Sequence, residues 1–176
     1  PKKEEEERRL KALAEYRILG TKPESCYDDI TKIAASTCNV PISLMTLVDK
    51  DKQWFKSKVG LEINETKRDW SFCTHAIQEN SPLIIQDAFQ DERFINNPLV
   101  TGDPKIRFYA GFPLKNRDGN KLGTLCVIDR KPGNLSPKQF NVMELLSKQI
   151  VSFLELRKKS LNLLEALSNL HKQEGI

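Results

Sequence analysis

The 176-residue chain lacks the sequence signatures of several common protein classes. No segment approaches the roughly 20 consecutive apolar residues that a membrane-spanning helix needs, and no signal peptide opens the sequence. There is also no glycine-rich phosphate loop, no paired metal-binding motif and no serine nucleophile elbow. We therefore expect a soluble polypeptide with no membrane segment, no metal site and none of these catalytic motifs.

Basic residues do not gather into one stripe. The chain has 28 lysine and arginine residues against 24 aspartate and glutamate residues, and no basic run is interleaved with aromatic residues. Proteins that bind nucleic acid usually concentrate positive charge on one face. We attribute the net charge of +4 to solubility and expect no nucleic-acid partner.

The chain has few cysteines, and their spacing is not that of a metal site. Cys26, Cys38, Cys73 and Cys126 show no CxxC spacing and no nearby histidine pair. This pattern argues against structural zinc and against the disulfide framework of a secreted domain. Reduced thiols are typical of a reducing compartment, so we expect a cytoplasmic protein.

The length and the 39% hydrophobic content suit one compact domain with an appendage. The sequence begins at Pro1 rather than at methionine and stops at Ile176 within a helical pattern. We expect this sequence to be a piece of a larger protein, and we expect the module that it regulates to lie outside this sequence.

Apolar spacing predicts two helices and a hairpin in the first third of the chain. Leu10, Leu13 and Ile18 repeat at near-helical spacing in a charged segment over residues 1–19, and Gly20 ends it. A second helix is predicted over residues 27–38. Residues 40–49 and 53–60 then alternate at strand spacing around a short turn, which predicts a hairpin.

The next third combines a short helix with a long loop and a second hairpin. Ser71 can cap a helix that extends to about residue 80, and a short strand follows at residues 83–86. Residues 87–104 are rich in Asp, Asn, Pro and Gly, so we predict a loop long enough to cover a pocket. Asp118 and Gly119 mark the turn between strands at residues 106–115 and 121–130. A sheet of about five or six strands results.

A long helix closes the chain. Ser136 and Pro137 can open it, and it continues without a breaker from about residue 138 to residue 171, far beyond the mean helix length of about 11 to 12 residues. The spacing of Ile150, Leu154, Leu161 and Leu164 fits a two-helix seam. It predicts a parallel homodimer through the terminal helices, with the N-terminal helix joining the bundle. Alternatively, residues 142–154 pack on the chain's own sheet.

Three segments supply the side chains of a candidate small-molecule pocket. They are SFCTHAI (71–77), RFYAGFPL (107–114) and LGTLCVID (122–129), which together bring aromatic rings, hydroxyls, thiols and an imidazole. Ligand sites are mainly apolar and contain a few orienting polar groups. Aromatic candidates for stacking on a planar ligand, or else for filling the core, are Trp70, Phe72, Phe94, Phe108 and Tyr109.

The polar candidates each have a structural alternative. The polar side chains expected to face the cavity are those of Cys73, His75, Thr124 and Cys126. His75 can equally be a structural histidine that makes no ligand contact. Asp87 can accept hydrogen bonds from an amine or a sugar hydroxyl, or cap the first turn of the loop. Arg107 can pair with a phosphate or form a surface ion pair.

The order of the predicted elements and several sequence segments are similar to those of a known family. The segments are SLMTLVD (43–49), QWFKS (53–57), DWSFCTHAI (69–77), DERFINNPLVTGDPKIRFYAGFPL (91–114) and LGTLCVID (122–129). Over residues 10–157 the chain resembles a GAF domain of the bacterial sensory, signal-transduction type. The resemblance implies an α+β fold: a six-stranded antiparallel sheet flanked by helices, a ligand cavity, and a long C-terminal signalling helix. The implied boundaries are an N-terminal helix at 1–19, a GAF domain at 20–157 and a helix extension at 158–176.

The resemblance also implies a regulatory domain rather than an enzyme, upstream of a histidine kinase, diguanylate cyclase or phosphodiesterase module. The leading ligand hypothesis is a cyclic nucleotide, cAMP or cGMP, although the signature of the phosphodiesterase GAF domains is not clearly present. A bilin or haem comes next, prompted by Cys73 and His75, but Thr74 separates residues that are adjacent in the phytochrome-type pattern. The alternatives are a ligand-free dimerisation spacer and a methionine sulfoxide reductase using Cys73 and Cys126.

Overall fold

A six-stranded antiparallel sheet forms the centre of the molecule, and its strands follow the order β3-β2-β1-β6-β5-β4. The structure, a computed structural model, describes residues 2–175. The strands are β1 (Ile42–Val48), β2 (Lys52–Val59), β3 (Glu65–Lys67), β4 (Leu83–Ile85), β5 (Phe108–Lys115) and β6 (Lys121–Asp129). The predicted hairpins are β1–β2 and β5–β6, and the predicted six-stranded antiparallel sheet is confirmed.

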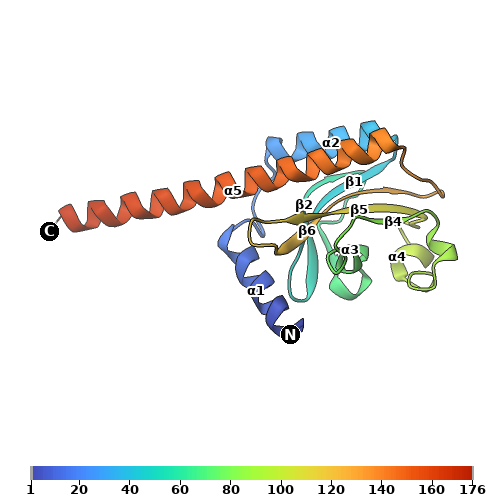
Figure 1. Ribbon diagram of the computed structural model, residues 1–176, viewed down its shortest axis with the longest axis horizontal. Helices are drawn as coiled ribbons and strands as arrows, with labels where there is room; N and C mark the ends of the chain where they lie inside the picture. Colours follow the sequence, from blue (N-terminus) through green and yellow to red (C-terminus); the bar gives the residue numbers. More distant parts are fainter. Residues whose placement is uncertain (1, 176) are drawn as a thin grey trace.

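Helices cover both faces of this sheet (Figure 1). The helices are α1 (Lys2–Glu15), α2 (Ser25–Cys38), α3 (Phe72–Ala76), α4 (Pro98–Thr101) and α5 (Pro137–Glu174), with 3-10 turns η1 (Arg68–Trp70) and η2 (Ala88–Gln90). Helices α2 and α5 lie on one face, α3 and α4 lie on the other, and α5 continues far beyond the sheet. Within the described residues, no helix has both the length and the apolar character needed to cross a membrane.

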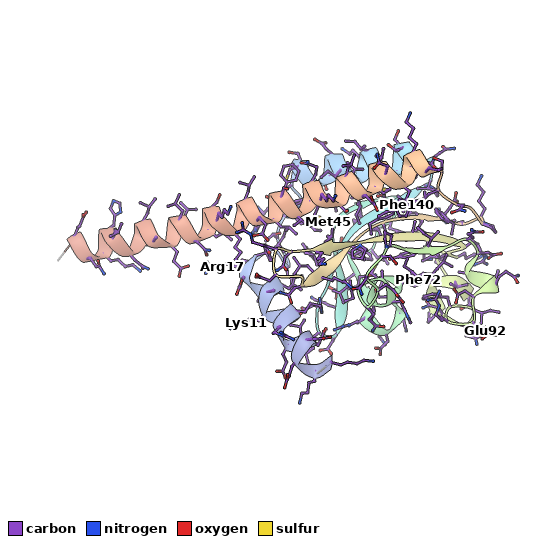
Figure 2. The ribbon with its side chains drawn as sticks, in the orientation of Figure 1. Lys11, Arg17, Met45, Phe72, Glu92 and Phe140 are labelled. Carbon is purple, nitrogen blue, oxygen red and sulfur yellow. The ribbon has the colours of Figure 1, made fainter. Side chains whose placement is uncertain are left out.

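Two separate apolar cores result from the alternation of side chains along the strands. On the α5 side, Met45 and Leu125 pack in one core, and the Phe112 and Phe140 rings meet at 5.1 Å. On the α3 side, Phe72 belongs to the second core. Figure 2 shows Met45 and Phe140 on the first side of the sheet and Phe72 on the other.

Helix α5 begins as predicted and divides into two halves. Ser136 and Gln139 form a capping box at its start, and Pro137 occupies the first turn. Ile150 and Leu154 are 0% and 1% exposed because they pack in the chain's own core. Their predicted place in a two-helix seam is therefore wrong, and the alternative of packing on the sheet is correct for this half.

Beyond the body of the domain, α5 exposes leucine side chains. These are Leu156, Leu163, Leu164, Leu167 and Leu170, with exposed fractions between 46% and 64%. Arg157 marks the boundary between the halves: its Nε donates to the carbonyl of Tyr16 at 2.7 Å and its Nη2 donates to the carbonyl of Arg17 at 2.8 Å. The connector after α1 is thereby fastened to α5.

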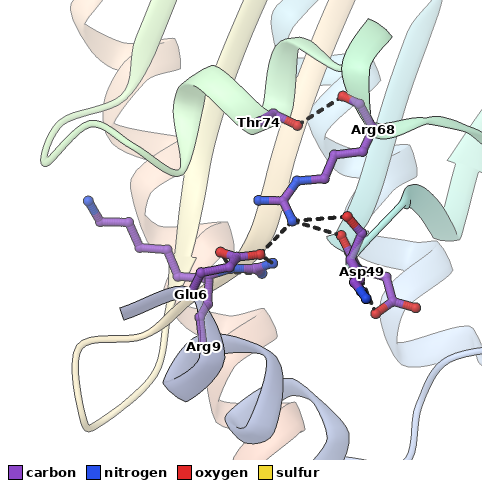
Figure 3. A network of polar contacts seen from close by, with 7 residues as sticks. Glu6, Arg9, Asp49, Arg68 and Thr74 are labelled. Atoms are coloured by element: carbon purple, nitrogen blue, oxygen red, sulfur yellow. Dashed lines mark hydrogen bonds and ion pairs between the residues drawn. The ribbon is translucent and has the colours of Figure 1, made fainter. Parts of the chain in front are cut away.

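Helix α1 does not run alongside the exposed half of α5, contrary to the predicted bundle (Figure 1). It packs instead near the start of β6 and near η1, through Glu6 (Figure 3). The Glu6 carboxylate accepts from Arg9 Nε at 2.9 Å and from Arg68 Nη1. The carbonyl of Arg68 accepts from the Thr74 hydroxyl at 3.1 Å, so α1 is linked through η1 to α3.

The Glu6 contact predicts a measurable pH dependence of stability. Hydrogen bonds from Arg9 and then Arg68 lower the pKa of Glu6 from 4.5 to about 2. Because the folded-state pKa lies below the unfolded value, this stabilisation is present above about pH 4.5 and is lost as the pH falls toward about 2. Since the Glu6 side chain is 33% exposed, we discount the effect to about 1 kcal/mol. Glu6→Gln should lower the free energy of unfolding by this amount at pH 7, measured by urea denaturation.

The same titration supplies the control. The exposed neighbour Glu7 is a matched position, and Glu7→Gln should leave the unfolding free energy unchanged within about 0.5 kcal/mol. The difference between wild type and Glu6→Gln should shrink steadily below pH 4.5. A difference that stays constant down to pH 2 would contradict the assigned role of the carboxylate.

Candidate ligand pocket

The candidate pocket lies between the sheet and the cover formed by α3, α4 and the loops beside them; we call it the sheet pocket. Apolar side chains of the strands form its floor and apolar side chains of the loops form its roof. They include Leu44, Phe55 and Ile128 from the strands, Leu99 from α4, and Leu61 and Ile106 from the loops. The lining contains no lysine, arginine, aspartate or glutamate.

The sheet pocket is very small. Its cavity volume is about 20 Å³, which is room for little more than one water molecule. Small-molecule sites usually measure roughly 300–1,000 Å³. Aromatic rings occupy the space: Phe72 stacks on Phe94 with centroids 4.1 Å apart, and the Phe72 and Tyr109 rings lie 5.1 Å apart. A ligand of ordinary size therefore requires movement of the cover.

A small polar cluster is buried at the floor of the sheet pocket. The Cys73 sulfur accepts from the Tyr109 hydroxyl at 3.1 Å and from the Thr124 hydroxyl at 3.0 Å. Thr46 lies opposite Thr124 on the neighbouring strand, and their hydroxyl oxygens are 3.0 Å apart. Gly111 leaves room for the tyrosine, because a Cβ at this position would lie 2.1 Å from the Tyr109 hydroxyl oxygen.

The surroundings of the two pocket thiols, Cys73 and Cys126, shift their pKa values in opposite directions. Burial by itself raises the pKa of Cys73, but donors surround its sulfur, led by the Cys126 thiol and the Thr124 hydroxyl, and they lower the pKa to about 6. Burial raises the pKa of Cys126 well above its usual range, and the neighbouring Cys73 adds to this effect. The hydroxyl donors therefore hold the Cys73 sulfur as a hydrogen-bond acceptor, and the more acidic thiol of the pair is Cys73.

The described residues contain no group of three or more His, Cys, Asp or Glu side chains placed to hold a metal ion. Neutral donors around one sulfur, enclosed by apolar side chains, can orient a small molecule through a few hydrogen bonds. They offer no counter-charge to an anion.

Six of the predicted site residues come together in or beside the sheet pocket. Phe72, Cys73, Tyr109 and Cys126 line it. Thr124 contacts it through its hydrogen bond to Cys73. Phe94 forms part of the cover by stacking on Phe72, so it fills the core as the alternative interpretation proposed.

Phe108 lies on the opposite face of the sheet, so its predicted contact with a ligand in this pocket is wrong. Its ring belongs to the core on the α5 side and lies close to Gly133. The physical reason is the alternation of side chains along a strand: Tyr109 faces the sheet pocket, so the adjacent Phe108 faces away.

Two of the remaining predicted residues lie at the cover rather than in the cavity. Trp70 is 36% exposed, with the Lys67 ammonium 5.1 Å from its ring centroid. His75 is partly buried and meets the Phe94 ring edge-on at 4.9 Å. Burial, followed by the positive charge of Arg93, lowers the pKa of His75. This arrangement is that of a structural histidine.

Asp87 adopts its structural alternative, whereas Arg107 makes contacts that the prediction did not include and no ion pair among the described residues. The Asp87 carboxylate accepts from the Phe89 amide at 3.0 Å and so caps η2. Arg107 Nη1 donates to the carbonyls of Val100 and Ile106, each at 2.9 Å, and its guanidinium lies 3.6 Å from the Phe89 ring centroid. Arg107 therefore holds the loop that carries part of the roof.

Sequence reasoning missed most of the apolar lining and two polar residues, Gln53 and Thr66. Gln53 is buried at the edge of the sheet pocket, where its amide donates to Thr66 at 3.0 Å and accepts from Ser71 at 2.6 Å. The strand residue Leu44 shares its face with Cys126, so strand alternation could have identified it. Leu61 lies in an irregular segment that carries no periodic signal.

A comparison with protein families identifies the fold. A family model described as "GAF domain" matches residues 22–153. Among curated proteins, the chain is 37% identical over 153 residues to a cyclic di-GMP phosphodiesterase of Pseudomonas aeruginosa. The match covers 86% of this chain but only 26% of that protein.

Solved structures of low sequence identity share the architecture. The GAF domain from the phosphoenolpyruvate-protein phosphotransferase of Acinetobacter superposes with a TM-score of 0.62 at 16% identity, covering 89% of this chain and 97% of that one. The free methionine-R-sulfoxide reductase of Neisseria meningitidis gives a TM-score of 0.62 at 12% identity, covering 83% and 87%. At these identities the likeness shows the fold alone. Because the family match covers more than half of the residues, the chain belongs to the GAF domain family.

Proposed function

We propose that this GAF domain is the sensory input of a larger signalling protein and that α5 carries its output. The observation that carries the proposal is the double role of α5, a single helix of 38 residues and so about 57 Å long. Its first half is part of the core behind the sheet pocket, whereas its second half leaves the domain. A movement at the sheet therefore has a rigid path out of the domain.

We further propose a parallel homodimer through the exposed half of α5. Leu156, Leu163, Leu167 and Leu170 succeed one another by seven, four and three residues, which is heptad spacing. In this register Leu156, Leu163 and Leu170 occupy d positions, where leucine favours two-stranded parallel coils. This seam differs from the one predicted from the sequence, because Ile150 and Leu154 of the predicted seam are buried in the chain's own core.

The path from the sheet pocket to α5 runs through β6. Thr124 binds Cys73 of α3 on one face of this strand, while the next residue, Leu125, belongs to the core that α5 shares. A ligand that binds an open arrangement of α3 better than the closed one would shift the population and move β6 against α5. Differential affinity for the two arrangements is the physical requirement.

The lining of the sheet pocket bears on the choice of ligand. A cyclic nucleotide, a bilin and a haem all exceed the cavity of about 20 Å³, and its lining offers no cationic side chain to the phosphate of a cyclic nucleotide. Cyclic nucleotide binding stays a prediction, and the apolar walls favour a small neutral molecule. All four cysteines are free thiols, which supports a cytoplasmic location.

For the output, we propose a module that makes or degrades cyclic di-GMP. Support comes from the 37% identity to part of a cyclic di-GMP phosphodiesterase. Catalysis by the GAF domain itself has little support, because both pocket thiols are fully buried. The small volume of the cavity, about 20 Å³, favours a second candidate, a ligand-free dimerisation spacer, which would connect output modules without transmitting a signal.

Insertions after Glu174 in the full-length protein separate the two candidates. Two extra helical residues rotate the following segment by about 200°, whereas seven residues restore the phase of the seam. If α5 transmits a signal, the two-residue insertion should change the rate of cyclic di-GMP hydrolysis at least about fivefold, and the seven-residue insertion should leave it near wild type. Equal rates for both insertions would contradict transmission and support the passive spacer.

A further inference from the structure

A second hollow, much larger than the sheet pocket, lies outside the family's ligand cavity. It is bounded by α1, by the residues that end and follow α3, and by the β5–β6 hairpin, and we call it the α1 groove. Its volume is about 730 Å³, which lies within the usual range of small-molecule sites. The groove is open to solvent without any movement of the cover over the sheet pocket.

Positive charge dominates the α1 groove. Three carboxylates line it, those of Glu5, Glu6 and Asp118, against six cationic side chains, Lys2, Arg8, Arg9, Arg68, Lys115 and Lys121. Glu6 is engaged by two of the arginines, Arg9 and Arg68. Among the described contacts, the other four cations form no ion pair, which leaves a net positive charge for a ligand to neutralise.

Two of these cations face one another across the hairpin. Lys115 on β5 is the direct cross-strand partner of Lys121 on β6, and like charges placed opposite one another destabilise a sheet. The Lys121 ammonium is partly buried and donates only to neutral acceptors, the carbonyl of Glu79 and the side-chain oxygen of Asn80. Burial, together with the charge of Lys115, lowers the pKa of Lys121. An anion between the two ammonium groups would relieve this repulsion.

We propose that the α1 groove binds a phosphorylated small molecule of nucleotide size, with Lys115 and Lys121 holding its phosphates. Gln78, Asn80 and Asn120 supply neutral hydrogen-bonding groups to the same groove, which suits a sugar or a base, and Ile77 supplies an apolar surface. The sheet pocket has no cationic side chain in its lining, whereas the α1 groove supplies several to an anionic ligand. This proposal does not depend on the function assigned to the sheet pocket.

Calorimetric titration of the 176-residue chain tests the proposal with three probes: cyclic di-GMP, GTP and inorganic pyrophosphate. At least one of the two nucleotides should show one saturable site per chain, and its affinity should fall between 50 and 300 mM salt, as expected for charged contacts. Lys115→Gln/Lys121→Gln should weaken that binding at least about tenfold. The matched control, Lys32→Gln/Lys148→Gln, removes the same charge from exposed positions on α2 and α5 and should change affinity less than about twofold.

Thermal melting of the unliganded variants guards against a folding artefact. The groove variant removes a like-charge pair but also the Lys121 hydrogen bonds to Glu79 and Asn80, so its melting temperature should stay within a few degrees of that of the wild type. The proposal is overturned if neither nucleotide binds at millimolar concentration or if only pyrophosphate binds. Equal weakening in the two double variants, or a groove variant that melts several degrees lower, would overturn it as well.

Discussion

Replacing Leu163 and Leu167 together with glutamate is expected to convert the proposed dimer into a monomer. Both leucines are largely exposed in the single chain, at 62% and 46%, and the proposed seam would bury them against a second copy. Removing two such contacts per helix should cost at least about 3 kcal/mol of association free energy. The dimer dissociation constant should therefore rise at least about 100-fold, as measured by sedimentation equilibrium.

A control variant that adds the same charge elsewhere on α5 distinguishes loss of the seam from a general effect of negative charge on the helix. Asn162 and Asn169 are exposed on α5 but lie outside the a and d positions, so Asn162→Glu/Asn169→Glu should leave the dissociation constant within about threefold of wild type. Both double variants should keep the melting temperature of the folded domain, since exposed positions tolerate such changes. A leucine variant that still sediments as a dimer would contradict the proposed seam.

Gly123→Ala should destabilise the domain by more than about 3 kcal/mol. Gly123 lies on β6 opposite Leu47 of β1, in the middle of the sheet. An added Cβ would lie 1.9 Å from the carbonyl oxygen of Thr46 and 2.8 Å from the Cα of Leu47. These are backbone atoms of a central strand, so the clash is relieved only by separating β1 from β6. Denaturation with guanidinium chloride measures the loss.

Gly133 provides the comparison, because a Cβ there would first meet the Phe108 ring at 3.4 Å. That contact is an ordinary one with a side chain, so Gly133→Ala should change the unfolding free energy by less than about 1 kcal/mol. Similar losses for the two substitutions would show that the β1–β6 contact is not the cause. The wild-type packing at Gly123 also keeps Thr46 beside Thr124, so the alanine variant should disturb the floor of the sheet pocket.

The sequence allowed the order of elements to be predicted because their signals are local. Ser136 and Pro137 begin α5 as a capping box and first-turn proline, and the turn containing Asp118 and Gly119 joins β5 to β6. Strand alternation also placed Thr124 and Cys126 on one face. Each of these features depends on residues that are neighbours in the chain.

Features that depend on tertiary partners were harder to predict. Periodicity showed that Ile150 and Leu154 share a stripe of α5, but not whether a sheet or a second helix covers that stripe. The α1 groove was missed because its walls come from distant segments with no shared period. Its one readable signal was the pairing of Lys115 with Lys121 across a predicted hairpin, which would have identified two like charges at close range.

The fastening of α5 at Arg157 has a mechanical consequence. The guanidinium holds the helix to the connector after α1 at the point where the inward-facing half ends and the outward-facing half begins. Beyond Arg157 the connector makes a further contact with α5, the Arg17–Glu165 ion pair at 3.3 Å. The part of α5 that follows Glu165 and extends to Glu174, about 14 Å of helix, is therefore the part that the connector leaves free to pair with a second helix or to continue into another module.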